Sequence, residues 1–244
     1  MESPKVLNQP ATPILIFFLT VSLMLSASVS ETYDYLQYVV QWQPAVCSNP
    51  NNHRMCKTNF PTQKFTIHGL WPTNFSGPLV RDCKRGPAFK ETEVRRIRAE
   101  LDEYWPDLFD RNDGLPDNEN FWSHEWERHG RCYLNVFGKQ FSYFNQAVTL
   151  GNRYNERIKN ILSRAIYPSN NNWWLRNDDI FNKIYQEFNR RPLLICADKY
   201  GYRPYNDPKQ LQEVILCFDV NGEDLIHCPP RRKTNCPQEI LFSL

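Results

Sequence analysis

The stretch SHEWERHGRC, residues 123–132, places two histidines, two glutamates, two arginines and a cysteine within ten positions. A zinc-protease helix carries two histidines four residues apart, with a glutamate beside the metal. Here His124 and His129 are five apart, and on a regular helix they would point about 140° away from each other. We therefore expect no metal site. The pairs four apart are Glu125 with His129 and His124 with Arg128, an arrangement suited to moving protons beside an anion.

Around this stretch, the sequence predicts a helical middle region enclosed by strands. Helical patterns cover residues 91–105, 118–130 with Gly130 as the stop, 142–165, and 176–189, where Asn177 or Asp178 is expected to cap the helix. Strand patterns cover 34–42, 64–72, 192–198, 212–220 and 224–228, with a hairpin turn at Asn221 and Gly222. Strands enclosing helices predict a single α+β domain over residues 31–244.

The first thirty residues read as a secretory signal peptide. Lys5 is followed by an apolar run over residues 14–25 and then by small residues, a pattern too short for a membrane span. We expect a secreted, extracellular protein with no membrane segment. All eight cysteines follow residue 30, and an even number in an exported chain predicts disulfides. Proximity in sequence favours Cys47–Cys56 and Cys217–Cys228, and leaves the other two pairings open.

The charge is modest. A formal net charge of +2 is below that of proteins that wrap nucleic acid. Residues 83–98 are locally rich in lysine and arginine, which indicates either a solvated helix face or a surface that contacts RNA or a partner. Asn74 begins the sequon Asn-Phe-Ser, and in an exported chain this predicts N-glycosylation.

A second motif, FTIHGLWP at residues 65–72, carries another histidine. His68 lies in a strand-like run that ends at Gly69, with Trp71 and Pro72 fixing the turn. A lone strand histidine is often a satisfied core residue. The adjoining turn, however, brings a flat aromatic ring close to this one.

Together, FTIHGLWP and FWSHEWERHGRC resemble the two active-site segments of the ribonuclease T2 family, the secreted endoribonucleases of plants and fungi. The resemblance covers essentially all of residues 31–244. It implies a ribonuclease T2-like fold with a central antiparallel sheet, several helices and disulfide staples. It also implies that Cys196–Cys236 encloses Cys217–Cys228, and that Cys83 joins Cys132.

The resemblance further implies cleavage of single-stranded RNA by transesterification, with no metal and no cofactor. Its general base would be His129 and its general acid His68, since histidine exists in either form near neutral pH. His124 would hold the phosphate, and Glu125 and Arg128 would stabilise the transition state. Glu125 is also expected to favour the protonated form of His129.

Two further features concern substrate binding. Trp71 is the candidate stacking platform for a base, with packing of the turn as the alternative. Family members commonly carry lysine at the position of Arg128. Arginine keeps the charge but cannot give up its proton.

Three biological roles follow from the resemblance. The favoured one is the style ribonuclease of gametophytic self-incompatibility, acting as a monomer, with pollen F-box proteins of a ubiquitin ligase as partners that read residues 83–98. The alternative is an S-like ribonuclease for phosphate recovery, senescence or defence. An inactive secreted binding or storage protein is a third possibility, but the chain keeps both motif histidines.

Overall fold

The centre of the sheet is a strand that is buried on both faces. All eight residues of β1 (Tyr35–Trp42) are buried, and successive side chains point to opposite faces. Leu36 and Tyr38 belong to the large core, and Tyr35 and Val39 to a second, smaller one. The chain thus builds a separate apolar layer on each side of β1.

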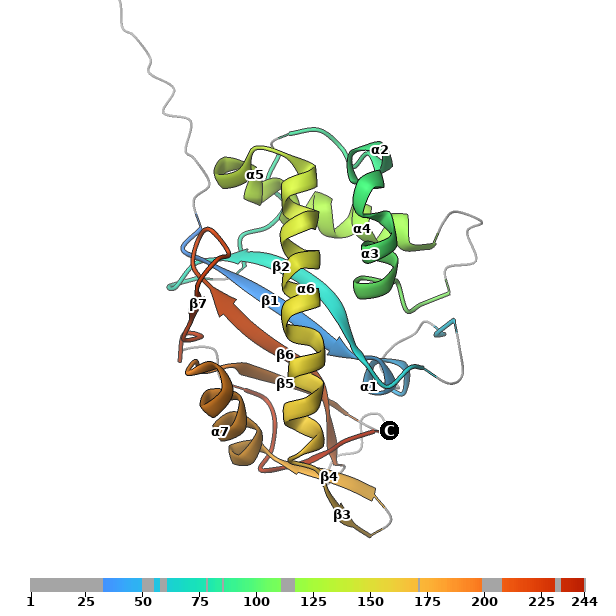
Figure 1. Cartoon of the computed structure of the whole chain (residues 1–244), viewed down its shortest axis with the longest axis vertical. Helices are drawn as coiled ribbons and strands as arrows, with labels where there is room; N and C mark the ends of the chain where they lie inside the picture. The colour runs from blue at the N-terminus through green and yellow to red at the C-terminus, as the bar shows by residue number, and fades with distance from the viewer. Residues whose placement is uncertain are drawn as a thin grey trace, which may run out of the picture. The chain divides into compact units, whose positions relative to one another are not determined.

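The strands form one mixed sheet (Figure 1). β2 (Phe65–Thr73) and β6 (Lys209–Phe218) pair antiparallel with β1, while β5 (Leu193–Asp198) and β7 (Leu225–Ile226) pair with β6. The order continues from β6 through β8 (Glu239–Leu241) and β4 (Asn172–Arg176) to β3 (Tyr167–Ser169). The α+β class and the central antiparallel sheet are confirmed, although β6 and β8 meet in parallel.

One long helix covers the large core. α6 (Gln140–Ser163) crosses one face of the sheet (Figure 1). It packs against β1 and β2, and buried side chains recur along it at helical spacing. The other helical segments are α1 (Gln43–Cys47), α2 (Glu91–Val94), the 3-10 turn η1 (Arg95–Ile97), α3 (Arg98–Tyr104), α4 (Asp117–Glu125), the π turn η2 (Trp126–Gly130), α5 (Arg131–Phe137) and α7 (Asn177–Phe188).

The computed structural model describes residues 33–49, 55–57, 61–77, 79–84, 86–110, 117–170, 172–198, 208–230 and 234–243. Residues 31–244 make up one compact unit. The expected signal peptide lies outside the described residues. Among those described, no helix has the length and apolar character needed to cross a membrane.

Gly130 does not end a helix, contrary to the prediction from sequence. It has right-handed helical dihedrals, φ −62° and ψ −34°, and α5 continues to Phe137. Its role is steric, because a Cβ at this position would lie 2.3 Å from the ring of Trp126 and 3.0 Å from that of Tyr143. The glycine lets two buried aromatic rings pack against the helix backbone.

Gly130→Ala is therefore expected to destabilise the protein. Overpacking a core costs about 1–3 kcal/mol, which exceeds the gain in helix propensity of up to about 1 kcal/mol. Urea unfolding should show a lower midpoint with a similar slope. Gly77→Ala is the matched control, since the nearest contact of its Cβ is 4.0 Å away. Equal midpoints for the two variants would contradict this steric role.

Two other boundaries differ from the predicted ones. The N-cap of α7 is Arg176, because Asn177 is used elsewhere: its backbone N–H donates to Gln238 and its side chain to Cys236. The hairpin between β6 and β7 does turn at Gly222, which has φ +72°. Its loop is longer than the two residues predicted.

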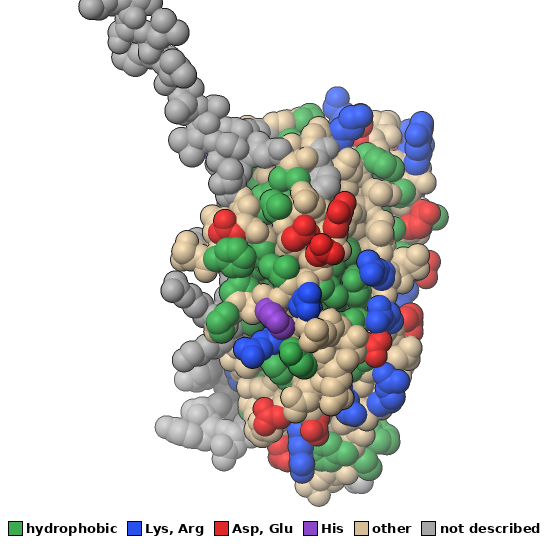
Figure 2. Space-filling model, turned by 60° about the vertical axis from the view of Figure 1, so that its left-hand side comes forward, with side chains coloured by type: hydrophobic (Ala, Val, Ile, Leu, Met, Phe, Trp, Pro, Cys, Tyr) green, Lys and Arg blue, Asp and Glu red, His purple; other side chains and the backbone are tan. Residues whose placement is uncertain are grey.

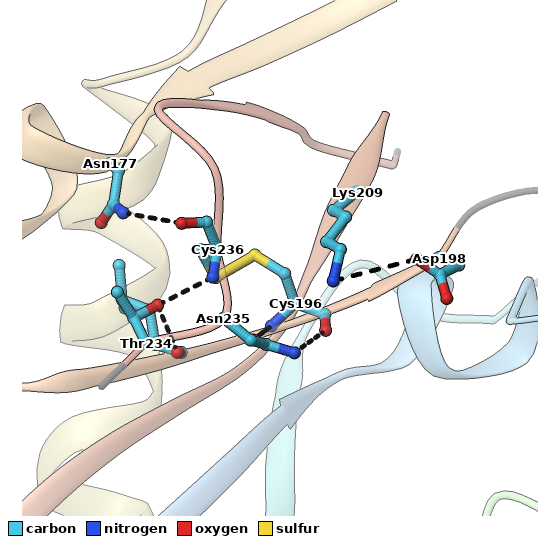
Figure 3. Close-up of a disulfide and its surroundings, with 8 residues drawn as sticks. Asn177, Cys196, Asp198, Lys209, Thr234, Asn235 and Cys236 are labelled. Atoms are coloured by element: carbon cyan, nitrogen blue, oxygen red, sulfur yellow. Dashed lines mark hydrogen bonds and ion pairs between the residues drawn. A yellow bond between two sulfur atoms is a disulfide. The ribbon is translucent and has the colours of Figure 1, made fainter. Parts of the chain in front are cut away.

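Four disulfides staple the fold. They join Cys47 to Cys56, Cys83 to Cys132, Cys196 to Cys236 and Cys217 to Cys228, the pairs expected from the sequence and the resemblance. Figure 3 shows the surroundings of Cys196–Cys236. There the Asn235 amide bonds both the N–H and the C=O of Cys196, each at 2.8 Å, and Thr234 donates to the carbonyl of Leu194. Side chains thus form hydrogen bonds with backbone groups of β5.

Candidate active site

His68 occupies a β-bulge in β2. The pairing of β2 with β1 skips one residue between Ile67 and Gly69, and His68 is that extra residue. A bulge re-aims its side chain and leaves its backbone outside the regular ladder. The His68 carbonyl instead accepts a hydrogen bond of 3.0 Å from the indole N–H of Trp105, which is fully buried. The bulge and this indole together position the first histidine.

A buried carboxylate from β6 contacts the same histidine. Oε1 of Glu213 lies 2.6 Å from Nδ1 of His68, and the Glu213 side chain is only 8% exposed. Glu213 was not among the candidate residues predicted from the sequence. The signal available in the sequence was a glutamate directly before the apolar run VILCF of a predicted strand. A carboxylate that is buried in such a strand requires a partner.

Trp71 contacts both motif histidines. Its ring centroid lies 5.0 Å from that of His68, edge-on, and 5.3 Å from that of His129. Its indole N–H donates to Oε2 of Glu125 at 2.9 Å. Gly69 makes this placement possible, because a Cβ there would lie 1.9 Å from the indole nitrogen. The structure therefore brings segments more than fifty residues apart together around one indole.

His129 lies on a π turn, so the regular-helix premise used for its geometry is wrong. The N–H of Arg131 bonds the carbonyl of Trp126, five residues back. Such turns occur frequently at functional sites. The extra residue in the turn shifts the register between α4 and His129. Glu125 consequently bonds Trp71 and does not act on the His129 charge in the way that we predicted.

The two imidazoles have opposite preferences for the proton. Burial would lower the pKa of His68, but the carboxylates of Glu213 and Glu125 raise it to about 9. Burial lowers the pKa of His129 to about 3, and the positive charges of Arg128 and the other site histidines act in the same direction. At neutral pH one ring is held protonated and the other neutral.

The pKa of Glu125 lies between the pKa values of these two histidines. Burial raises its pKa to about 7, although the His68 charge and the Trp71 hydrogen bond both oppose the shift. Its side chain is almost fully buried. A carboxyl group with this pKa exists in both protonation states near neutrality.

A cavity of about 210 Å³ opens beside His68. His124, which is exposed, and Glu125 also line it. The remaining lining residues come from β1, α4 and the segment after α3: Gln41, Asp107, Leu108, Phe109 and Phe121. His129 and Trp71 are not part of this lining. The protonated histidine thus lines the cavity, whereas the neutral one does not.

Arg128 lies on the π turn, partly exposed. Its Nε is 3.7 Å from a carboxylate oxygen of Asp82, and both side chains reach solvent, so this contact is weak. The Arg128 carbonyl accepts a hydrogen bond of 2.7 Å from the N–H of Asp82. In the described part of the chain, no three His, Cys, Asp or Glu side chains are grouped as metal ligands.

Comparison with known proteins gives one consistent family. Residues 33–228 match the Ribonuclease T2 family. Ribonuclease S-3 of Pyrus pyrifolia is 33% identical, over 88% of this chain and 90% of that protein. Extracellular ribonuclease LE of Solanum lycopersicum is 28% identical, over 96% of this chain and 97% of that protein.

A solved structure agrees with these sequence matches. A crystal structure of an RNase MC1 mutant in complex with 5′-GMP superposes with a TM-score of 0.71 at 31% identity. The alignment covers 86% of this chain and 100% of that one.

Proposed function

The chain belongs to the ribonuclease T2 family and is a metal-independent ribonuclease, and we propose that His68 and His129 carry its chemistry. The ribose 2′-OH of single-stranded RNA attacks its own phosphorus, the bond from phosphorus to the 5′-oxygen breaks, and a 2′,3′-cyclic phosphate remains. The main support is that these two imidazoles flank one indole with opposite proton affinities.

Each histidine suits one half of the proton transfer. Neutral His129 accepts the proton of the 2′-OH as general base. Protonated His68 donates a proton to the leaving 5′-oxygen as general acid. His124 and Arg128 supply positive charge or hydrogen-bond donors for the phosphate, and such preorganised groups stabilise the developing charge. Glu125 fixes the Trp71 indole beside both rings.

Substrate binding in this proposal is local to the site. Figure 2 shows that acidic and basic side chains are interspersed over the face drawn, without forming one broad basic surface. Affinity for RNA then depends on the cavity beside His68 and on stacking against aromatic rings such as the partly exposed Trp71. A base stacked on an aromatic ring gains about 1–3 kcal/mol whatever its identity, which is compatible with little base preference.

The pH dependence of kcat/KM is expected to be a broad plateau. On the acid side, activity falls as His129 becomes protonated and can no longer accept a proton. On the alkaline side, activity falls as His68, with a pKa near 9, loses the proton that it must donate. Initial rates on a dinucleoside monophosphate between pH 3 and 10 measure both limbs. An alkaline limb near the ordinary histidine value of about 6.5 would contradict the protonated state of His68.

The products of RNA cleavage test the proposed reaction. We expect oligonucleotides ending in 2′,3′-cyclic phosphate, formed at the same rate with and without EDTA. Absence of cleavage by the purified protein would favour the secreted binding or storage protein instead.

We propose that the protein is secreted and N-glycosylated. Residues 1–30 have the pattern of a signal peptide, and a relative is named an extracellular ribonuclease. Asn74 lies in the turn after β2, next to the exposed Phe75 and Ser76. Mass spectrometry of the protein from culture medium tests both points, through the mature N-terminus and a glycan at Asn74.

We further propose a role as the pistil determinant of self-incompatibility, with pollen F-box proteins as partners. The similarity to a Pyrus ribonuclease named S-3 supports this role. Within residues 83–98, the exposed Lys84, Lys90 and Arg96 are the best candidates for a surface read by a partner. Arg98 is held instead by Glu119 at 2.5 Å and by the Trp122 ring.

Suppressing the transcript in styles tests the biological role. Loss of rejection of self pollen supports it. Unchanged rejection, with expression induced in leaf or root by phosphate starvation, would favour the S-like role that the similarity to ribonuclease LE also permits.

A further inference from the structure

We propose that Glu213 is a positioning residue that holds His68 as the proton donor of the reaction. Its carboxylate binds Nδ1, which leaves Nε2 as the nitrogen available to the substrate in the cavity. This inference rests on the proposed role of His68 as general acid.

The geometry of the sheet makes this contact specific. Glu213 pairs with Gln41 in the register of β6 and β1, and β1 lies between β6 and β2. The carboxylate therefore reaches His68 across an intervening strand. Ile67 belongs to the large core, and Ile215, two residues after Glu213, belongs to the smaller one, so Glu213 lies on the face of the sheet opposite to Ile67.

A stability role explains the contact poorly. Replacing a buried ion pair by apolar side chains is often neutral or stabilising, and the apolar Ile215 lies two residues further along β6, on the same face as Glu213. A carboxylate hydrogen-bonded to one imidazole nitrogen does fix the tautomer and the ring orientation, and it favours the charged form. The arrangement is therefore better suited to proton transfer than to packing.

Glu213 neither gains nor loses a proton in the proposed step. His129 takes the proton of the 2′-OH, and Nε2 of His68 gives its proton to the leaving oxygen. Nδ1 keeps its proton throughout and donates it to Oε1 of Glu213. After the step His68 is neutral and His129 is protonated, and exchange with water restores both.

Other charges face His68 as well. Glu125 from α4 raises its pKa less than Glu213 does, and the charge of His68 is felt by His129 on the π turn. Asp107 and His124 line the same cavity. If Glu213 becomes glutamine, Glu125 is the main remaining carboxylate to oppose the effect of burial. The pKa of His68 then falls, while the amide oxygen can still accept the Nδ1 hydrogen bond.

The test compares two leaving groups. A dinucleoside monophosphate has a poor leaving group that needs a proton, whereas a uridine 3′-(4-nitrophenyl phosphate) has a leaving group that departs without one. At pH 7.5, Glu213→Gln is expected to lower kcat/KM on the dinucleotide by about 10- to 100-fold, less than the full contribution of general acid catalysis, about 10²–10⁴-fold, because the amide still accepts the Nδ1 hydrogen bond. The nitrophenyl ester should change by less than about threefold, since it does not need the acid. The alkaline limb on the dinucleotide should move to lower pH.

Each outcome has a separate meaning. Equal losses on both substrates with an unchanged pH profile, or no loss on either, would overturn the role of Glu213. His68→Ala is the reference: it must show the same selective loss, and equal losses there would overturn the general-acid role of His68 itself. If Glu213→Gln does not fold, an NMR titration of the His68 ring in the unaltered protein decides, and a pKa at or below about 6.5 would overturn the proposal.

Discussion

His129→Ala is expected to lower kcat/KM for single-stranded RNA by about 10²–10⁴-fold, the usual contribution of a positioned general base. The reason is the low pKa of His129, which keeps the ring neutral and able to accept the 2′-OH proton over most of the pH range. Unlike the Glu213 variant, this one should lose activity on the nitrophenyl ester too, because every substrate must lose the 2′-OH proton.

His129 is buried, so its removal also leaves a cavity. His129→Gln fills most of that space and lacks a titrating group, and the same loss of kcat/KM is expected with a thermal unfolding midpoint close to that of the unaltered protein. His227→Ala is the matched control, since His227 is exposed and stacks on Tyr185 of α7. Activity of His129→Gln within tenfold of the His227 control would exclude His129 as the general base.

Trp105→Ala is expected to cost about 3–5 kcal/mol of unfolding free energy, as for other buried tryptophans. The Trp105 ring is fully buried against Tyr143 and Phe144. Its removal also leaves the carbonyl of His68 without its hydrogen-bond donor, which adds a penalty because buried polar groups are costly when unpaired. Urea unfolding measures the loss.

Trp105→Phe separates the two contributions. It keeps most of the packing but loses the indole N–H, so the remaining loss of stability should be smaller while kcat/KM still falls. Trp174→Phe is the control, because its indole N–H also bonds a backbone carbonyl, that of Ser169, on the β3–β4 hairpin. If Trp105→Phe keeps full kcat/KM, the hydrogen bond to the bulge does not position His68.

Much of the framework was predictable from the sequence. β1, β2 and β6 are long, apolar and rich in β-branched and aromatic residues, and α6 repeats its buried positions every three or four residues over 24 residues. The strands β3, β4 and β8 were not predicted. They have three to five residues each and carry exposed polar positions. β3 and β4 form a short local hairpin, and β8 pairs with β4 from a segment distant in sequence.

The sequence motifs singled out most residues of the candidate site, but not its geometry. Motifs identified His68, Trp71, Glu125 and His129. The bulge that displaces His68 and the π turn under His129 leave no local sequence signal, because both depend on what packs against the backbone. Gly130 illustrates this: glycine usually indicates a helix end, yet here it makes room for aromatic rings of the large core.

The side chains along β5 have a further consequence for the protein at high concentration. Exposed strand edges are templates for pairing with another chain and hence for aggregation. In this fold Asn235 and Thr234 bond the backbone of Cys196 and Leu194, and the disulfide from Cys196 to Cys236 keeps those side chains in place. A neighbouring molecule can pair with Leu194 and Cys196 only by first breaking these side-chain hydrogen bonds. Because the disulfide holds the side chains in place, this edge resists self-association even at high protein concentration.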